Sequence, residues 1–127
     1  MPGFKGTFVH QLDSKGRLAL PNKLRSQIPE GGTVTVGAER CVTFYPADLW
    51  RVTEQGLNLL DPLDPDVRDT KRRLFGAAEE VSFDRQGRIV LPGHLRGYAG
   101  LAKEVVVLGV GDLIEVWDAD EWRSRRE

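Results

Sequence analysis

Two stretches of the chain share one order of apolar and polar positions, and each predicts a strand, a tight turn and a second strand. In the first, the apolar residues Leu12, Leu18 and Leu20 flank a polar segment at 13–17. The same order recurs at 83–92, seventy-one positions later. Period-two alternation of this kind is typical of half-buried strands. Each stretch is therefore expected to form a hairpin: 4–13 with 17–20, and 81–84 with 88–91.

The two copies also agree residue by residue. Aligning 13–25 with 84–96 gives identity at seven of thirteen positions: Asp, Gly, Arg, Leu, Pro, Leu and Arg, in that order. Agreement over so short a window indicates an internal duplication. In both copies the proline starts a short helical turn, because proline is tolerated at the first position of a helix.

The rest of the pattern predicts further strands and helices, which complete the two copies and separate them. The expected strands are 33–37, 41–45, 105–108 and 113–117, the last two joined by a loop at 109–111, and longer helices begin at Pro46, Asp64 and Asp118. The segment 53–77 has no counterpart in the second copy and predicts an inserted helical hairpin. We expect a β-rich α+β fold with repeat 1 at 5–52, the insertion at 53–77 and repeat 2 at 78–124.

The polar segment of each copy has a defined turn chemistry. Three residues separate Asp13 from Arg17, and Gly16 in the third loop position suits a three-residue turn closed at positive φ. Alternation places the aspartate and the arginine on one face, where the carboxylate can accept loop N–H groups and a charged hydrogen bond. Asp84 and Arg88 repeat this arrangement. Two interpretations stay open: a turn stapled for stability, or a tip that presents an oriented guanidinium to an anion.

Length and composition are those of an ordinary soluble protein. The 127 residues are 40% hydrophobic and 29% charged, which suits one compact domain or two small halves that share a core. No apolar run approaches the roughly 20 residues needed to cross a bilayer, and no signal peptide is visible. We therefore expect a cytoplasmic protein with no membrane partner.

Positive charge is concentrated in the duplicated segments, although the net charge of the chain is −1. The segment 13–25 carries a net +3 and the segment 84–96 a net +2, so the remainder sums to −6. The basic side chains are Lys15, Arg17, Lys23 and Arg25 in the first copy, and Arg85, Arg88 and Arg96 in the second. Such a concentration is the electrostatic footprint expected of a protein that binds a polyanion.

Motifs for catalysis or metal binding are mostly absent from the sequence. The single cysteine, Cys41, falls within an expected strand, which favours a packing role. His10 and His94 occupy different repeat positions, and neither has a metal-ligand spacing to another His or Cys. The glycines at 109 and 111 lack the third glycine of a dinucleotide fingerprint. We expect no cofactor and no metal, and an enzyme is the least favoured class.

The chain resembles the MraZ family. The resemblance rests on Phe4-Lys5-Gly6, on Leu-Asp-x-Lys-Gly-Arg-Leu-x-Leu-Pro at 12–21, on Asp-x-x-Gly-Arg-Ile-x-Leu-Pro at 84–92 and on Glu-Val-Trp-Asp at 115–118. It covers nearly the whole chain. It implies two AbrB/SpoVT-like repeats that form a pseudo-dimeric swapped-hairpin barrel, and subunits that assemble into an octameric or dodecameric ring.

The same resemblance implies a function. It implies a bacterial transcriptional regulator that binds short G-rich direct repeats upstream of the division and cell-wall operon, which begins with the regulator's own gene. The partner it implies is double-stranded DNA, and the location is nucleoid-associated. The family's motif aspartates and arginines correspond here to Asp13, Arg17, Asp84 and Arg88.

A mechanism predicted from the residues agrees with that function. A two-stranded ribbon fits the major groove, and an arginine bidentate to guanine O6 and N7 is the commonest specific base contact. We therefore expect Arg17 and Arg88 to bind guanine. The other basic residues are expected to contact phosphates: Lys15, Lys23, Arg25, Arg85 and Arg96. A ring-forming scaffold that binds acidic partners or RNA through basic loops remains the alternative.

Overall fold

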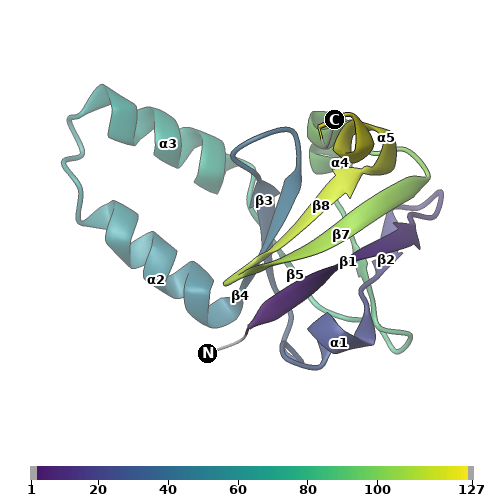
Figure 1. Ribbon diagram of the computed structural model, residues 1–127. Coiled ribbons are helices and arrows are strands. Elements are labelled where there is room, and N and C mark those ends of the chain that lie inside the picture. Colours follow the sequence, from purple (N-terminus) through teal and green to yellow (C-terminus); the bar gives the residue numbers. More distant parts are fainter. Residues whose placement is uncertain (1–2, 126–127) are drawn as a thin grey trace.

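The computed structural model describes residues 3–125. They form a body of strands and short helices, from which two longer helices project to one side (Figure 1). The fold class is α+β, as expected, and helices and strands take up similar shares of the described residues, 34% and 33%. Strand residues therefore do not outnumber helical residues in the way that the expected β-rich class implies; each projecting helix has 12 residues.

The order β-β-α-β-β-α occurs twice along the described chain, with one further helix between the two series. The strands are β1 Phe4–Gln11, β2 Arg17–Ala19, β3 Gly32–Val36, β4 Val42–Pro46, β5 Glu79–Val81, β6 Arg88–Val90, β7 Glu104–Gly111 and β8 Ile114–Asp118. The helices are α1 Asn22–Arg25, α2 Ala47–Asn58, α3 Pro65–Gly76, α4 Gly93–Ala99 and α5 Ala119–Arg125. The expected boundary between residues 52 and 53 falls inside α2, which runs on for longer than its counterpart α5.

Each half of the chain gives its first strand to the sheet of the other half. β1 pairs antiparallel with β7, and β5 pairs antiparallel with β3. The β4–β8 pairing joins the two halves, which gives a six-stranded sheet in the order β1-β7-β8-β4-β3-β5. The second sheet is a ribbon of two strands, β2 and β6, one from each half.

The two expected hairpins do not form as such. Within the described residues, a lone bridge between Leu12 and Leu18 links β1 to β2, and β2 then pairs with β6. β5 likewise pairs with β3 rather than with β6. Most strands are where alternation predicts them, but the strand expected at 81–84 lies at 79–81 instead. Alternation identifies the buried face of a strand and not its neighbour. In the ribbon, the buried Leu18 and Ile89 lie in register with each other.

The expected loop at 109–111 is also wrong. These residues extend β7, because Gly109 pairs with Gly6 of β1 on one side and with Ile114 of β8 on the other. The turn between β7 and β8 therefore falls at 112–113. Glycine is depleted in strands, so the sequence signal there favoured a loop.

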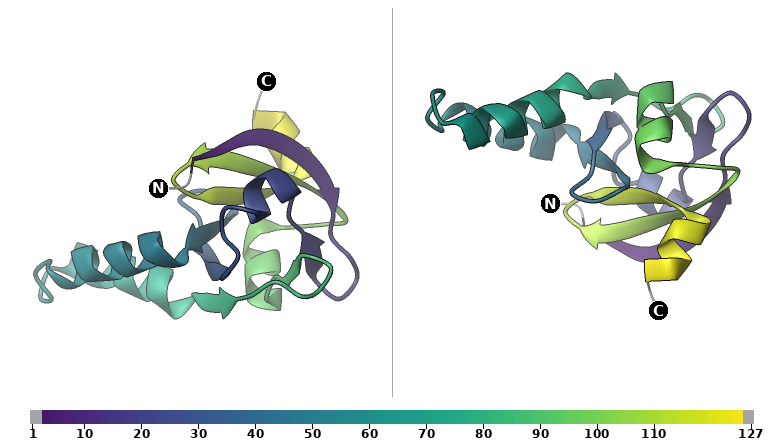
Figure 2. Two further views of the ribbon diagram at one scale, coloured as in Figure 1. Left: turned by 90° about the horizontal axis from the view of Figure 1, so that it is seen from below. Right: turned by 90° about the horizontal axis from the view of Figure 1, so that it is seen from above.

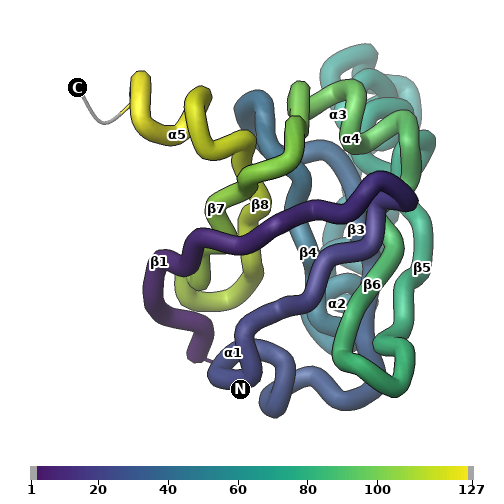
Figure 3. Tube along the Cα trace, turned by 90° about the vertical axis from the view of Figure 1, so that its right-hand side faces the viewer, coloured from purple at the N-terminus to yellow at the C-terminus, as the bar shows by residue number. Residues whose placement is uncertain are grey.

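The main core fills the space between the large sheet and the ribbon, and both copies contribute to it at equivalent positions. Leu24 of α1 and Leu95 of α4 are fully buried in this core. Burying such a side chain stabilises the fold by about 1.5–3 kcal/mol. The burial of Leu95 holds α4 beside the β1–β2 turn, and the burial of Leu24 holds α1 beside the β5–β6 turn (Figure 3).

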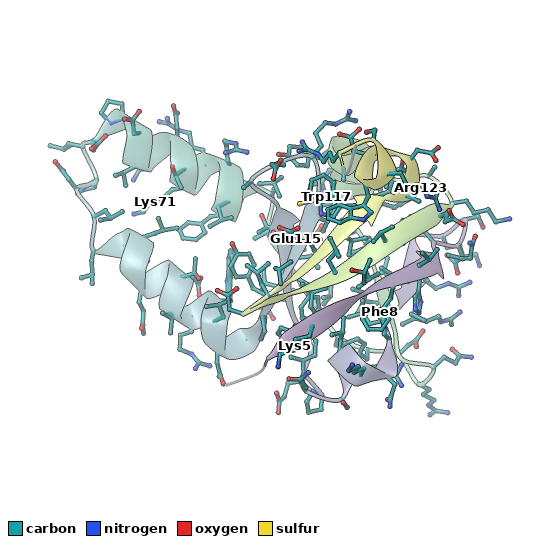
Figure 4. All side chains as sticks on the ribbon, viewed as in Figure 1. Lys5, Phe8, Lys71, Glu115, Trp117 and Arg123 are labelled. Carbon is teal, nitrogen blue, oxygen red and sulfur yellow. The ribbon has the colours of Figure 1, made fainter. Side chains whose placement is uncertain are left out.

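A smaller core on the opposite face of the large sheet holds α5. Trp117 of β8 packs against Trp122 of α5 with ring centroids 5.5 Å apart. Its indole Nε1–H donates to Glu115 at 2.9 Å, and the ring lies beneath α5 (Figure 4). Trp50 of α2 contacts Tyr45 with centroids 5.2 Å apart. Trp50 and Trp122 therefore dock the two helices that end each series, α2 and α5.

The helices α2 and α3 form an arm that extends away from the body, as both views in Figure 2 show. The side chain of Asp64 caps α3 by accepting the N–H of Asp66 at 2.9 Å, as the sequence predicts. Neither helix contains a buried residue. Among residues 3–125, no helix has both the length and the apolar character that a bilayer crossing requires.

Candidate nucleic-acid interface

The first turn (13–17) and the second turn (84–88) fix their arginines in the same way. Asp13 Oδ1 accepts the backbone N–H groups of Lys15 and Arg17, each at 2.9 Å, and Oδ2 accepts the Nε–H of Arg17 at 2.6 Å. Asp84 makes the same three bonds in the second turn, with 2.9 Å to the Nε of Arg88. The three-residue spacing in the sequence predicts this geometry correctly.

Glycine is needed at the third loop position of each turn. Gly16 has φ 80° and Gly87 has φ 74°, in the left-handed region that side-chain-bearing residues avoid. Each glycine N–H donates back to the carbonyl of the turn aspartate, at 3.0 Å in both turns. The backbone therefore closes around the carboxylate and holds it in place.

The same bonds lower the pKa of both turn carboxyls. The pKa of Asp13 lies below its ordinary value of 3.8, chiefly because the backbone N–H of Arg17 donates to the carboxylate, and the Arg17 side chain adds to the effect. The pKa of Asp84 is lowered in the same way by the backbone N–H of Arg88. Both carboxylates are therefore ionised near neutral pH, and each arginine keeps a charged partner.

Both arginines lie on the outer face of the β2–β6 ribbon. The register pairs Arg17 with Val90 and Ala19 with Arg88. The middle residue of each strand is buried, so alternation places these four residues on the opposite side. Val90, opposite Arg17, is 54% exposed. We call this surface the ribbon face; it carries both guanidinium groups on one two-stranded element.

Arg25 and Arg96 each pack against the turn of the other copy. Arg96 Nε–H donates to the Leu91 carbonyl at 3.0 Å, and a Cβ added to Gly16 would lie 2.8 Å from this nitrogen. The guanidinium of Arg25 covers Gly87 in the same way. Their expected role as phosphate contacts stays a prediction, and the structure adds a supporting role for the turns.

The other predicted basic residues are exposed around the ribbon. Lys15 lies in the first turn, Arg85 in the second turn and Lys23 on α1. Lys103 also lines a shallow groove with Asp13 and Arg96, a position that sequence reasoning missed. It lies outside the duplicated stretch, so no repeat pattern could have identified it.

Potential metal ligands do not cluster in the part of the chain that the structure describes. Residues 3–125 contain no group of three or more His, Cys, Asp or Glu side chains placed to hold a metal ion. Cys41 is 1% exposed, and burial raises the pKa of its thiol to about 12, which confirms the packing role. His94 lies 2.9 Å through Nε2 from the Ala77 carbonyl, a contact between α4 and the end of α3.

Comparison with known proteins identifies the family. The family described as "MraZ protein, putative antitoxin-like" matches residues 4–73 and again residues 74–126. The chain belongs to the MraZ family. Each matched segment contains one of the two turns, so the MraZ match covers both arginines of the ribbon face.

Curated relatives carry the same family name. The transcriptional regulator MraZ of Thermomicrobium roseum is 44% identical over 124 residues, 98% of this chain and 87% of the relative. The transcriptional regulator MraZ of Syntrophomonas wolfei is 40% identical with the same coverage. That of Herpetosiphon aurantiacus is 39% identical over 95% of this chain and 85% of the relative. MraZ similarity therefore extends over nearly the full length of the chain.

Proposed function

We propose that this MraZ-family chain is a sequence-specific DNA-binding transcriptional regulator that contacts DNA through the ribbon face. The observation that carries the proposal is the pair Arg17 and Arg88, each fixed by an aspartate, on one outward surface of a two-stranded ribbon. The relatives are named transcriptional regulators, which is not an enzyme class.

The ribbon suits major-groove binding in shape and chemistry. The major groove admits a two-stranded β-ribbon, and arginine binds guanine O6 and N7 in bidentate fashion. In each turn the aspartate occupies the Nε–H of the arginine. The terminal amino groups of Arg17 and Arg88 are therefore the donors that reach guanine.

The surrounding cations supply affinity and register. Phosphate contacts position a protein on the duplex and carry no sequence information directly. We assign this role to the exposed Lys15, Lys23 and Arg85, together with Arg25 and Arg96 beside the turns. Lys103 joins this set because it borders the first turn.

The proposed architecture is a pseudo-dimeric swapped-hairpin barrel of two AbrB/SpoVT-like repeats, at 5–52 and 78–124, with the helical hairpin 53–77 inserted between them. The exchange of β1 and β5 between the halves supports it. The proposed assembly is a homo-oligomeric ring of eight or twelve subunits. Exposed apolar side chains on the arm, such as Leu59 at 87% and Leu63 at 86%, support association.

The proposed target is a set of tandem short G-rich repeats in the promoter upstream of the protein's own gene, in the division and cell-wall gene cluster. A single ribbon makes few contacts, so repetition in a ring facing repeated boxes raises affinity through effective concentration. This function places the protein in the cytoplasm, associated with the nucleoid.

A gel-shift experiment tests the proposal. The full chain is titrated with its own upstream DNA, with scrambled DNA of the same length and with RNA of the same length. We expect preferential binding to the upstream DNA. Equal binding to all three, or a preference for RNA, would instead support the alternative, a ring scaffold whose basic loops bind acidic partners or RNA.

A further inference from the structure

The two turns share one plan but differ in how firmly they hold their arginines. In the second turn, Arg88 Nη2 donates to Gln86 Oε1 at 2.6 Å, in addition to the Nε bond to Asp84. This bond uses one of the two N–H groups of Nη2, so the other and those of Nη1 stay available to guanine. In the first turn, Lys15 stands at the position equivalent to Gln86. A lysine ammonium has no acceptor, so Lys15 cannot add a second bond to Arg17.

The arginines that pack against the turns show the same difference. Arg25 lies against the second turn, and its Nη2 donates to Asn22 Oδ1 at 3.1 Å. Its counterpart Arg96 lies against the first turn, and there Gly93 replaces Asn22. Glycine has no side chain to accept the bond. Both amide acceptors therefore lie at the second turn, although Gln86 and Asn22 come from different halves of the chain.

This difference has a consequence for recognition. A guanidinium that is already held loses less conformational freedom when it binds, and it cannot turn to suit a mismatched base. An arginine that is held at one nitrogen and lies beside a lysine can adjust to base or phosphate. The second turn is therefore suited to discriminate between sequences, and the first turn to supply affinity.

We propose that Gln86 is a positioning residue that makes the second turn the sequence-discriminating contact of this protein. It acts by fixing the guanidinium of Arg88, and Asn22 does the same for Arg25 behind it. The first turn, with Lys15 and Arg17, supplies adaptable, salt-dependent affinity. This inference rests on the proposed function.

The test compares three variants of the full chain on upstream and scrambled DNA at two salt concentrations. Gln86→Ala should reduce the preference for upstream over scrambled DNA by roughly threefold to tenfold, the loss expected when one side chain must be ordered on binding. Gln86→Glu keeps an acceptor oxygen, so it should retain the preference while its negative charge weakens binding to both DNAs. Lys15→Ala, the matched control, should weaken both equally and flatten the salt slope by about one.

The outcomes separate the inference from the function on which it rests. If Gln86→Ala keeps the wild-type preference, or Lys15→Ala lowers the preference as much, the inference is wrong and the function stands. If Gln86→Ala and Gln86→Glu both lose the preference together with thermal stability, Gln86 is only structural and the inference is again wrong. A wild type that shows no preference overturns both.

Discussion

At the scale of single residues, the turn aspartates act through their arginines. Each carboxylate accepts hydrogen bonds from two backbone N–H groups and from the Nε–H of its arginine. The arrangement orients a cation without burying it, because the side chains of Arg17 and Asp13 are 35% and 36% exposed. Exposed ion pairs contribute little to stability, so the main effect of these aspartates should be on binding.

Asp13→Asn tests this directly. The amide keeps an oxygen for the loop N–H groups but loses the charge that holds Arg17. We expect a melting temperature near that of the wild type and a loss of affinity for upstream DNA of roughly tenfold or less, the cost of ordering one freed side chain. Asp48→Asn, which alters an exposed pair with Arg51 on α2, is the matched control and should leave both unchanged. A collapsed melting temperature with intact affinity of the folded fraction would show that Asp13 is structural.

The lowered pKa values of the two turn carboxyls predict how the free energy of unfolding depends on pH: it should fall in strong acid. In the folded state both carboxyls have a pKa below the ordinary 3.8. The ionised carboxylates therefore stabilise the fold fully at pH values above 3.8, and this contribution is lost as the pH falls through the folded-state pKa. The free energy of unfolding should therefore differ between the wild type and Asp13→Asn/Asp84→Asn by a small amount, because the pairs are exposed, and this amount should be constant from about pH 7 to about pH 5. The difference should shrink only in stronger acid. A difference that already vanishes near pH 5 would contradict this account.

At the scale of elements, the sequence predicts local structure well and partners poorly. The expected strands at 33–37 and 41–45 appear as β3 and β4, and the helix predicted to begin at Asp64 is capped there. The pairing of β2 with β6 could not be predicted, because both strands show the same alternation and neither indicates its neighbour. The packing of Arg25 against Gly87 could not be predicted either, since these residues are 62 positions apart in the sequence.

The turn glycines provide a prediction at this scale. Gly16→Ala would place a side chain at φ 80° against Arg96, and we expect it to destabilise the protein by roughly 1–3 kcal/mol. Gly56→Ala, inside α2 with open space around it, is the control and should stabilise by roughly 0.5–1 kcal/mol. Chemical denaturation gives both values. Equal effects of the two substitutions would contradict the geometry of the turn.

Part of the candidate site could be predicted and part could not. The bonds from Asp13 to Arg17 and from Asp84 to Arg88 follow from spacing and strand geometry. Both arginines lie on the ribbon face because β2 pairs with β6, and the sequence alone does not show this pairing. Gln86 and Lys103 belong to no sequence motif. Their roles are inferred from their contacts in the structure, with Arg88 and with the groove beside the first turn.

At the scale of the whole molecule, the arm exposes apolar surface that a single copy leaves uncovered. We expect an oligomer larger than a dimer, and light scattering at dilute concentration should show it. Leu59→Ser/Leu63→Ser on the arm should lower the mass, whereas Val9→Ser, at a 57% exposed position on β1, should not. A single 14.2 kDa species for the wild type would contradict the expectation.

The central claim is that Arg17 and Arg88 of the ribbon face bind the bases of the target DNA. The most direct measurement is a titration of upstream and scrambled DNA, at two salt concentrations, with Arg17→Ala, Arg88→Ala and the double variant, while the mass is checked in parallel. Each single variant should cost roughly 1–3 kcal/mol on the upstream DNA. Lys23→Ala should instead weaken both DNAs alike and flatten the salt slope by about one.

The double variant gives the decisive result. Because repeated contacts in an oligomer multiply the loss, it should lose its preference for upstream DNA altogether while keeping the mass of the wild type. If the double variant still prefers upstream over scrambled DNA by the wild-type ratio, the ribbon face does not bind the bases, and the helices α1 and α4 become the next candidates.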